Sequence, residues 1–252
     1  MTTWENLLPE DAIKAILGRH HDAMLMGAHA RDRIVGINAG LPGGRRTSDL
    51  DLAIAVPSIA AFKDATSDLD QSGGTGMRFR VERVQVDLIP FGVGGRLRSP
   101  IEVVEGVQMD ITGIDEAFAT AERMPDPYQG LRIPTLQAMI VLKTVAWKMR
   151  WRETDKDAQD LYLLLGCVDE GIYEDRCYCD DLDRFDGDPR RVGAYLTGLD
   201  AARDLPRASA VCRDAWSSTR LVNAMLPTTS TEYELEALGQ LLTDLAVGSR
   251  QH

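Results

Sequence analysis

The sequence predicts an α/β (α+β) protein, with a mixed sheet and helices in its N-terminal part and helices alone in its C-terminal part. Two observations lead to this fold class. Up to about residue 130, short apolar runs alternate with glycine-rich breaks and with segments of helical periodicity. After Arg132 the strand pattern fades, and Pro134 stands in the first turn of a long predicted helix. We therefore predict two domains, residues 1–130 and residues 131–252.

The N-terminal part carries both helical and strand periodicity. Residues 9–19 repeat apolar side chains at helical spacing, and residues 59–69 do so after the capping pair Pro57-Ser58. A helix is also expected directly after Gly27. Strands are expected where apolar residues cluster or alternate between turn residues, at 23–26, 50–56, 79–89 and 107–111.

Helical periodicity dominates the C-terminal part. Helices are expected at 134–147 and, after a turn, at 155–165. The segment 186–189, Asp-Gly-Asp-Pro, marks a break, and residues 231–247 have the pattern of an amphipathic closing helix.

Composition excludes several classes of protein. The 252 residues are 44% hydrophobic and 27% charged, which is typical of a globular chain with a substantial core. The formal charge of −11 argues against a protein that coats nucleic acid over its whole surface, although a local basic groove is compatible with it. No apolar run reaches membrane-spanning length, and the first residues lack a signal-peptide pattern, so we predict a cytoplasmic protein. Four cysteines are too few and too irregular for a disulfide framework.

Two aspartates, Asp49 and Asp51, open the apolar run 50–56. Alternate side chains of a strand share a face, so both carboxylates should point the same way and repel each other unless a cation lies beside them. Their position also disfavours a phosphatase of the haloacid dehalogenase kind, in which the paired aspartates follow the strand instead of opening it.

A third carboxylate, Asp87, interrupts an alternating apolar segment. A lone acid in a half-buried strand is costly unless it is paired or bound to a metal. If this strand lies beside the first, Asp49, Asp51 and Asp87 can form an oxygen-only site for hard divalent cations such as Mg²⁺ or Mn²⁺.

Three segments together resemble a known family: GAHARD from Gly27, RTSDLDLA from Arg46 and VDLIPFG from Val86. They are similar to the nucleotidyltransferase superfamily that includes DNA polymerase β and, within it, to the AbiEii-like toxins and their MenT relatives. KTVAW from Lys143 and KDAQDL from Lys156 resemble the helical part of that group. The resemblance covers roughly residues 20–165.

The resemblance implies a nucleotidyltransferase domain followed by a helical domain. It implies an enzyme that transfers a nucleoside monophosphate from an NTP to an acceptor, either RNA such as the 3′ end of a tRNA or a protein side chain. In that group the enzyme is the toxin of a toxin–antitoxin pair, so a cognate antitoxin is an implied partner. Asp49, Asp51 and Asp87 would hold the metal ions, and Asp87 would also accept a proton.

Four further residues are implied contacts of the nucleotide: Gly27, Ala28, Arg31 and Lys143. Each has a structural alternative. Gly27 and Ala28 can form an ordinary strand-to-helix turn, Arg31 can pair with its neighbour Asp32, and the Lys143 side chain can extend along its own helix.

Asp157 and Asp160 lie three residues apart on one helical face, and the resemblance implies that one of them supports the site. Pairing with Arg150 or Arg152 is the structural alternative. Arg45 and Arg46 are candidate contacts of the acceptor, or else solvated loop charges.

Two other functions use the same aspartates. One is a catalytically silent module that binds nucleotide or a partner without turnover. Its motivation is that Ala28 stands where the superfamily usually has serine, and that residues 36–44 lengthen the connection to Asp49. The other is a small-molecule enzyme such as an antibiotic adenylyltransferase, which differs from the toxin only in the acceptor.

Overall fold

The computed structural model describes residues 8–20, 22–39, 47–171, 174–178, 182–227 and 229–251. By their contacts these residues fall into two compact units, the first within Met1–Arg33 and Arg45–Thr135, the second within Ile34–Gly44 and Leu136–His252. The sheet lies in the first unit, and the second is helical, which confirms the predicted fold class. The predicted domain borders, 1–130 and 131–252, stay a prediction.

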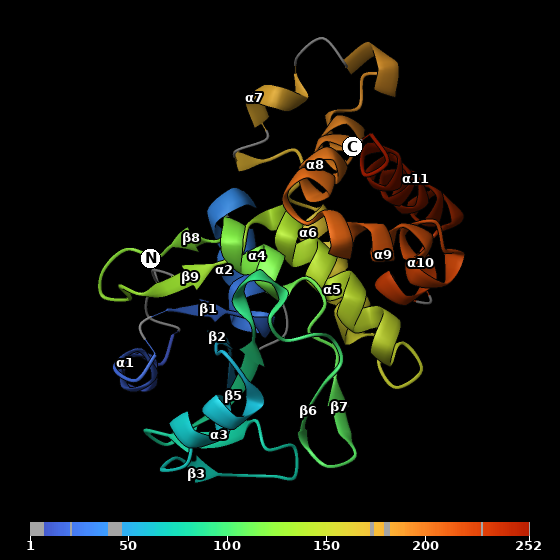
Figure 1. Cartoon of the computed structure of the whole chain (residues 1–252). Helices are drawn as coiled ribbons and strands as arrows, with labels where there is room; N and C mark the ends of the chain where they lie inside the picture. The colour runs from blue at the N-terminus through green and yellow to red at the C-terminus, as the bar shows by residue number, and fades with distance from the viewer. Residues whose placement is uncertain are drawn as a thin grey trace. The chain divides into compact units, whose positions relative to one another are not determined.

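The described strands of the first unit form a seven-stranded mixed sheet with the order β3-β4-β5-β2-β1-β9-β8 (Figure 1). β2 runs parallel to β5 and β1 parallel to β9, whereas the other neighbours are antiparallel. The strands are β1 (Ala23–Leu25), β2 (Asp49–Ala55), β3 (Asp70–Gln71), β4 (Arg78–Val81), β5 (Val84–Phe91), β8 (Glu122–Arg123) and β9 (Leu131–Ile133). A separate pair is formed by β6 (Ile101–Val104) and β7 (Val107–Met109).

Helices of the first unit follow the capping and periodicity signals. They are α1 (Glu10–Leu17), α2 (Gly27–Ala39), which continues into the second unit, α3 (Ile59–Ala65), α4 (Ile114–Thr120) and the short 3₁₀ helix η2 (Val93–Gly95). The Ser58 side chain accepts a hydrogen bond from the Ala61 amide at 3.1 Å, which confirms the predicted cap. α3 packs on the sheet through Phe62, whose ring meets that of Phe79 edge to face at 6.3 Å.

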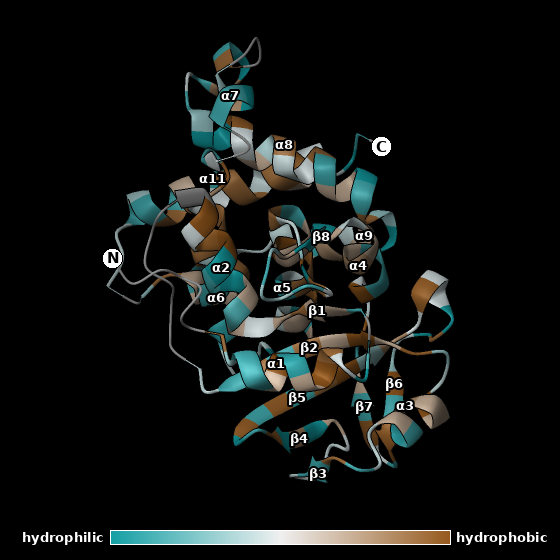
Figure 2. Ribbon diagram, turned by 90° about the vertical axis from the view of Figure 1, so that its left-hand side faces the viewer, coloured by the Kyte–Doolittle hydropathy of each residue, from teal (hydrophilic) through white to brown (hydrophobic). Residues whose placement is uncertain are grey.

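The central strands β2 and β5 are largely hydrophobic (Figure 2). Leu50 and Leu52 on β2 and Val86 and Leu88 on β5 are fully buried. The alternate positions between them carry the aspartates and are half-buried. The period of two therefore sends apolar side chains to one face and carboxylates to the other.

One strand prediction was wrong. Residues 79–89 do not form a single strand, because the chain turns at Glu82 and Arg83 and pairs β4 with β5 as a hairpin. Both turn residues have positive φ, 46° and 67°, the backbone conformation of a type I′ turn. Turns of this kind usually contain asparagine or glycine, so Glu82 and Arg83 do not indicate a turn.

All the secondary structure described in the second unit is helical (Figure 1). The predicted helices 134–147, 155–165 and 231–247 correspond to α5, α6 and α11 and are confirmed. The helices of this unit are α5 (Leu136–Arg150), α6 (Lys156–Leu165), α7 (Glu174–Cys177), α8 (Pro189–Asp204), α9 (Pro206–Trp216), α10 (Thr219–Met225), α11 (Glu232–Gly248) and the 3₁₀ helix η4 (Leu182–Phe185).

Glycines allow α8 and α11 to approach closely. A Cβ placed on Gly198 would lie 2.1 Å from the carbonyl oxygen of Leu245. A Cβ on Gly248 would lie equally close, 2.1 Å, to the carbonyl oxygen of Tyr195. The backbones of the two helices therefore touch at two places where only glycine fits.

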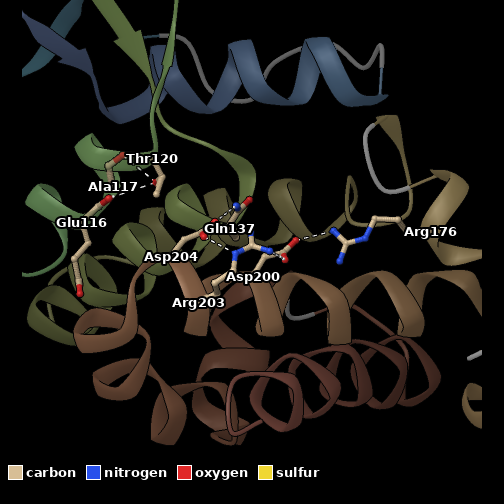
Figure 3. Close-up of polar contacts among 8 residues, drawn as sticks. All are labelled: Glu116, Ala117, Thr120, Gln137, Arg176, Asp200, Arg203 and Asp204. Carbon is tan, nitrogen blue, oxygen red and sulfur yellow. Dashed lines mark hydrogen bonds and ion pairs between the residues drawn. The ribbon is translucent and has the colours of Figure 1, made fainter. Parts of the chain in front are cut away.

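A chain of polar contacts connects α7, α8 and α5 (Figure 3). Arg176 and Arg203 both pair with the buried carboxylate of Asp200, at 2.8 and 2.9 Å. Arg203 also donates two hydrogen bonds to Asp204, which accepts a further one from Gln137 at 2.9 Å. Because the buried carboxylate of Asp200 and the partly buried one of Asp204 are both matched by donors, this network supports the helical packing.

Across the part of the chain that the structure describes, no helix is both long and apolar enough to cross a membrane.

Candidate functional site: a carboxylate row on the sheet

The predicted metal ligands lie on neighbouring strands in register. Asp51 of β2 is the Cα partner of Asp87 on the parallel strand β5. On the other side of β5, the antiparallel strand β4 places Arg78 opposite Asp87. Residues in register on adjacent strands point to the same face, so Arg78, Asp87 and Asp51 form a row across the sheet. Asp49 lies on the same face, two residues before Asp51.

Arg78 bridges the carboxylates of this row. Its Nε and Nη2 atoms donate to the two oxygens of Asp87, each at 2.7 Å, in the bidentate geometry of a strong pair. The same Nη2 lies 3.6 Å from Asp49 Oδ2. The cation expected beside Asp49 and Asp51 is therefore the guanidinium of Arg78, a side chain of the protein itself.

The row is neither buried nor freely solvated. The side chains of Arg78, Asp49 and Asp87 are 37%, 32% and 23% exposed. The pKa of Arg78 is raised, first by its hydrogen bonds with Asp87 and then by attraction to the aspartates, while partial burial opposes the rise. Arg78 thus stays charged, and its single positive charge is set against three carboxyl groups.

Asp51 closes the row at the start of α2. Gly27, the first residue of α2, has φ of 62°, and a Cβ there would lie only 1.8 Å from Asp51 Oδ2. The carboxylate therefore occupies the space in which any other residue would carry its side chain. This end of the helix has the positive pole of its dipole and amides without intrahelical partners, which favours negative charge.

Asp49 is positioned by its neighbours. The Thr47 hydroxyl accepts a hydrogen bond from the Asp49 amide at 3.2 Å, and the Ser48 hydroxyl donates to Asp49 Oδ1 at 3.0 Å. Asp49 Oδ2 faces Arg78 instead. The polar residues that lead into β2 thus fix the direction of the first carboxylate.

The chemistry of the row suits a hard divalent cation, but its present contacts do not. All three acids offer carboxylate oxygens, the ligands that Mg²⁺ and Mn²⁺ prefer. Within the described residues, however, no group of three or more His, Cys, Asp or Glu side chains is arranged to hold a metal ion. Both oxygens of Asp87 are bonded to Arg78. A cation that used both oxygens of Asp87 would therefore have to displace the guanidinium of Arg78.

Two predicted nucleotide contacts near the row are buried. The Ala28 side chain is 6% exposed and Arg31 is 0% exposed. Arg31 Nη2 lies 2.6 Å from Asp32 Oδ1, the ion pair that was the structural alternative for this residue. A phosphate contact by Arg31 would therefore require its side chain to leave the core, and its predicted role stays a prediction.

The remaining predicted site residues cluster in the second unit. Lys143 of α5 lies 3.2 Å from Asp157 Oδ1 and 2.5 Å from Asp160 Oδ2, both on α6. Arg150 Nη2 lies 2.6 Å from Asp157 Oδ2, as the structural alternative for that residue proposed. Both aspartates are almost fully buried, so the cluster joins α5 to α6 through matched charges.

Two tryptophans stand one helical turn apart at the end of α5. Trp147 is 5% exposed and belongs to the core of the second unit. Trp151, one helical turn later, lies under two guanidinium groups, those of Arg152 at 4.4 Å and Arg220 at 4.0 Å from its ring centroid. Arg45 and Arg46, the candidate acceptor contacts, lie outside the described residues.

Arg78 is the site residue that the sequence did not reveal. It stands just before the segment 79–89, which the sequence predicts as one strand, so no pattern connects it with Asp87. The available signal was the alternation of Arg78, Phe79, Arg80 and Val81, which has the period of a strand with a basic face. Only the unseen turn at Glu82 and Arg83 brings that basic face beside the acids.

No protein-family model, curated protein or solved structure matches the chain.

Proposed function

We propose that the chain is a metal-dependent nucleotidyltransferase that transfers a nucleoside monophosphate from an NTP to an acceptor. One observation carries the proposal: Asp51 and Asp87 are register partners on parallel strands, with Asp49 on the same face. A row of three carboxylates is costly for a protein to hold without a use for divalent cations. The close approach of Asp51 to Gly27 adds a helix N-terminus at one end of the row, where phosphate is favoured.

The three aspartates share the binding of the cations in this proposal, and Asp87 has a further task. Asp49 and Asp51 hold the cation that accompanies the triphosphate, and Asp87 joins them in holding a second one. Bound divalent cations would lower the pKa of the attacking hydroxyl and offset charge on the leaving group. Asp87 accepts the proton of the acceptor hydroxyl, whose oxygen bonds to the α-phosphorus while the bond to the bridging oxygen breaks and pyrophosphate leaves.

The acceptor and the biological role extend the same proposal. We take RNA, such as a tRNA 3′ end, or a protein side chain as the acceptor, and the toxin of a toxin–antitoxin pair as the role. The support is the resemblance of the segments around Gly27, Asp49 and Asp87 to AbiEii-like toxins.

Transfer of label tests this function. The chain is incubated with each α-³²P-labelled NTP, Mg²⁺ or Mn²⁺, and total RNA or total protein. Label should enter one fraction and be absent with the Asp49→Ala/Asp51→Ala variant. A matched variant, Asp70→Asn, removes an exposed carboxylate of β3 and should keep the transfer. Equal labelling by the double variant would exclude the assignment of the aspartates.

A catalytically silent binding module is the second candidate, and the contacts of Arg78 favour it. The guanidinium occupies both oxygens of Asp87, so the row is internally paired without a metal. This candidate expects nucleotide binding that is independent of divalent cations and no pyrophosphate release with any acceptor. Metal-dependent turnover would exclude it.

A further inference from the structure

Arg78 is attached to the row by contacts that solvent can replace. Its side chain is 37% exposed, and its strongest partner, Asp87, is 23% exposed. Even a bidentate pair of this exposure can exchange its partner, because water solvates both charges well once they separate. The bidentate contact therefore holds the guanidinium in place without locking it there.

Arg78 and a divalent cation compete for the same atoms. Both oxygens of Asp87 accept hydrogen bonds from the guanidinium, and one oxygen of Asp49 forms a longer ion pair with it. A cation bound by these carboxylates would be repelled by the guanidinium at its present position. Binding of the cation and release of Arg78 must therefore occur together.

The released guanidinium stays close to the row, because Arg78 is the direct register partner of Asp87. Its planar fork of N–H donors matches two oxygens of a phosphate as well as it matches two oxygens of a carboxylate. A triphosphate that arrives with its cation brings such oxygens to the place that the guanidinium has just left.

We infer that Arg78 exchanges partners during binding: it pairs with Asp87 and Asp49 in the free chain and with triphosphate oxygens once a divalent cation occupies the carboxylates. This inference rests on the proposed function and adds a nucleotide-binding residue to it. It gives Arg78 two opposite effects, since the residue weakens binding of the cation alone and strengthens binding of the triphosphate.

The first arm of the test measures Mn²⁺ binding without nucleotide, by the loss of the electron paramagnetic resonance signal of free Mn²⁺. Arg78→Gln should bind Mn²⁺ about fivefold more tightly than the unmodified chain, the factor expected from one half-exposed ion pair. Arg80→Gln is the matched control, because Arg80 lies on the same strand, is exposed and has Gln85 as its partner on β5. Its Mn²⁺ affinity should not change.

The second arm measures binding of inorganic triphosphate in saturating Mn²⁺ by calorimetry, which avoids any assumption about the base. Arg78→Gln should bind it about fivefold or more weakly, and Arg80→Gln should bind it like the unmodified chain. Arg78→Lys keeps the charge and loses the fork. This variant should leave Mn²⁺ affinity nearly unchanged and weaken triphosphate binding, and it serves alone if Arg78→Gln does not fold.

The outcomes distinguish the partner exchange of Arg78 from the proposed nucleotidyl transfer. Tighter Mn²⁺ binding together with weaker triphosphate binding supports the exchange. Unchanged binding in both arms, or weaker binding in both, overturns it and leaves Arg78 a structural residue. If Asp51→Asn abolishes Mn²⁺ binding while Arg78→Gln does not alter it, the proposed function stands and the exchange falls. If neither the unmodified chain nor Arg78→Gln binds Mn²⁺, both fall.

Discussion

Asp51 and Asp87 face each other in register across two parallel strands, β2 and β5, with the guanidinium of Arg78 on the far side of Asp87. Register partners of like charge destabilise a sheet unless something offsets them. Arg78 offsets this repulsion only in part, since one cation stands against three acids. The arrangement is therefore better suited to holding cations than to stabilising the fold.

Substitution of either register partner should reduce activity, and substitution of Asp87 should also reduce the stability of the protein. Asp51→Asn and Asp87→Asn should each reduce nucleotidyl transfer on the order of a hundredfold or more, since each removes a cation ligand. Asp87→Asn also loses the bidentate pair with Arg78, which should cost about 0.5–1 kcal/mol of unfolding free energy. Urea denaturation measures this second effect. Unchanged stability of Asp87→Asn would contradict the contribution of the pair.

Gly27 should be irreplaceable for a reason beyond its backbone conformation. In Gly27→Ala the new Cβ meets the Asp51 carboxylate, so the variant should lose Mn²⁺ binding and about 1–3 kcal/mol of stability. Gly94→Ala is the matched control: Gly94 has a similar φ of 67°, but a Cβ there has nothing within 4 Å. It should cost only about 1 kcal/mol and keep Mn²⁺ binding. Equal effects of the two variants would show that backbone strain alone is at work.

Lys143 should stabilise the second unit strongly. Lys143→Met leaves the buried carboxylates of Asp157 and Asp160 with less positive charge, which should cost about 3–5 kcal/mol. Lys156→Met, at an exposed position on α6, should change stability by less than about 0.5 kcal/mol. Thermal denaturation compares the two variants. A small effect of Lys143→Met would mean that the neighbouring Arg150 suffices for both carboxylates.

Two glycines of the same helix should respond in opposite ways to alanine. Gly248→Ala places a methyl group 2.1 Å from the carbonyl oxygen of Tyr195, so α8 and α11 must separate, at a cost of about 2 kcal/mol or more. Gly239→Ala meets only Val222 at 3.9 Å and should stabilise α11 by up to about 1 kcal/mol. Denaturation midpoints of both variants test the close approach of the helices. A Gly248→Ala variant as stable as Gly239→Ala would contradict the close approach of α8 and α11.

Stability should fall in mild acid because of two histidines. Burial lowers the pKa of His29, with a further decrease from Arg31 against an increase from Asp32, and burial and Arg19 lower the pKa of His20. The unfolded chain therefore binds more protons, so stability is complete above the ordinary pKa of 6.5 and decreases as the pH falls through it. The His20→Gln/His29→Gln variant should have a smaller difference in urea midpoint between pH 8 and pH 5.5. An unchanged difference would assign the effect to other groups.

The sequence predicted those features that depend on local patterns. The alternation around Asp49 and Asp87 predicts that each carboxylate lies on the face of the sheet opposite to its buried neighbours. The proline at position 134 predicts the start of α5. Features that depend on distant pairing stayed hidden. β9 has only three residues, and its pairing with β1 connects Leu131 with Ala23. Likewise, Arg78 joins the carboxylates only because two residues without the usual turn preference, Glu82 and Arg83, reverse the chain.

Helices α8 and α9 were missed for a different reason. Small residues occupy their contact positions, among them Gly198 and Ala201 on α8 and Ala208 on α9. Such residues allow helices to pack closely but give little hydrophobic contrast along the sequence. The large apolar residues that mark α5 are therefore fewer in α8 and α9.

Pyrophosphate release tests most directly whether the carboxylate row is a centre of nucleotidyl transfer. The chain is supplied with each NTP and with total RNA and protein as acceptors, with Mg²⁺ or with excess chelator, beside Asp87→Asn and Asp70→Asn. Our account predicts release that requires Mg²⁺, is lost in Asp87→Asn and persists in Asp70→Asn. Equal release by Asp87→Asn and the unmodified chain, or release that persists in the chelator, would contradict it.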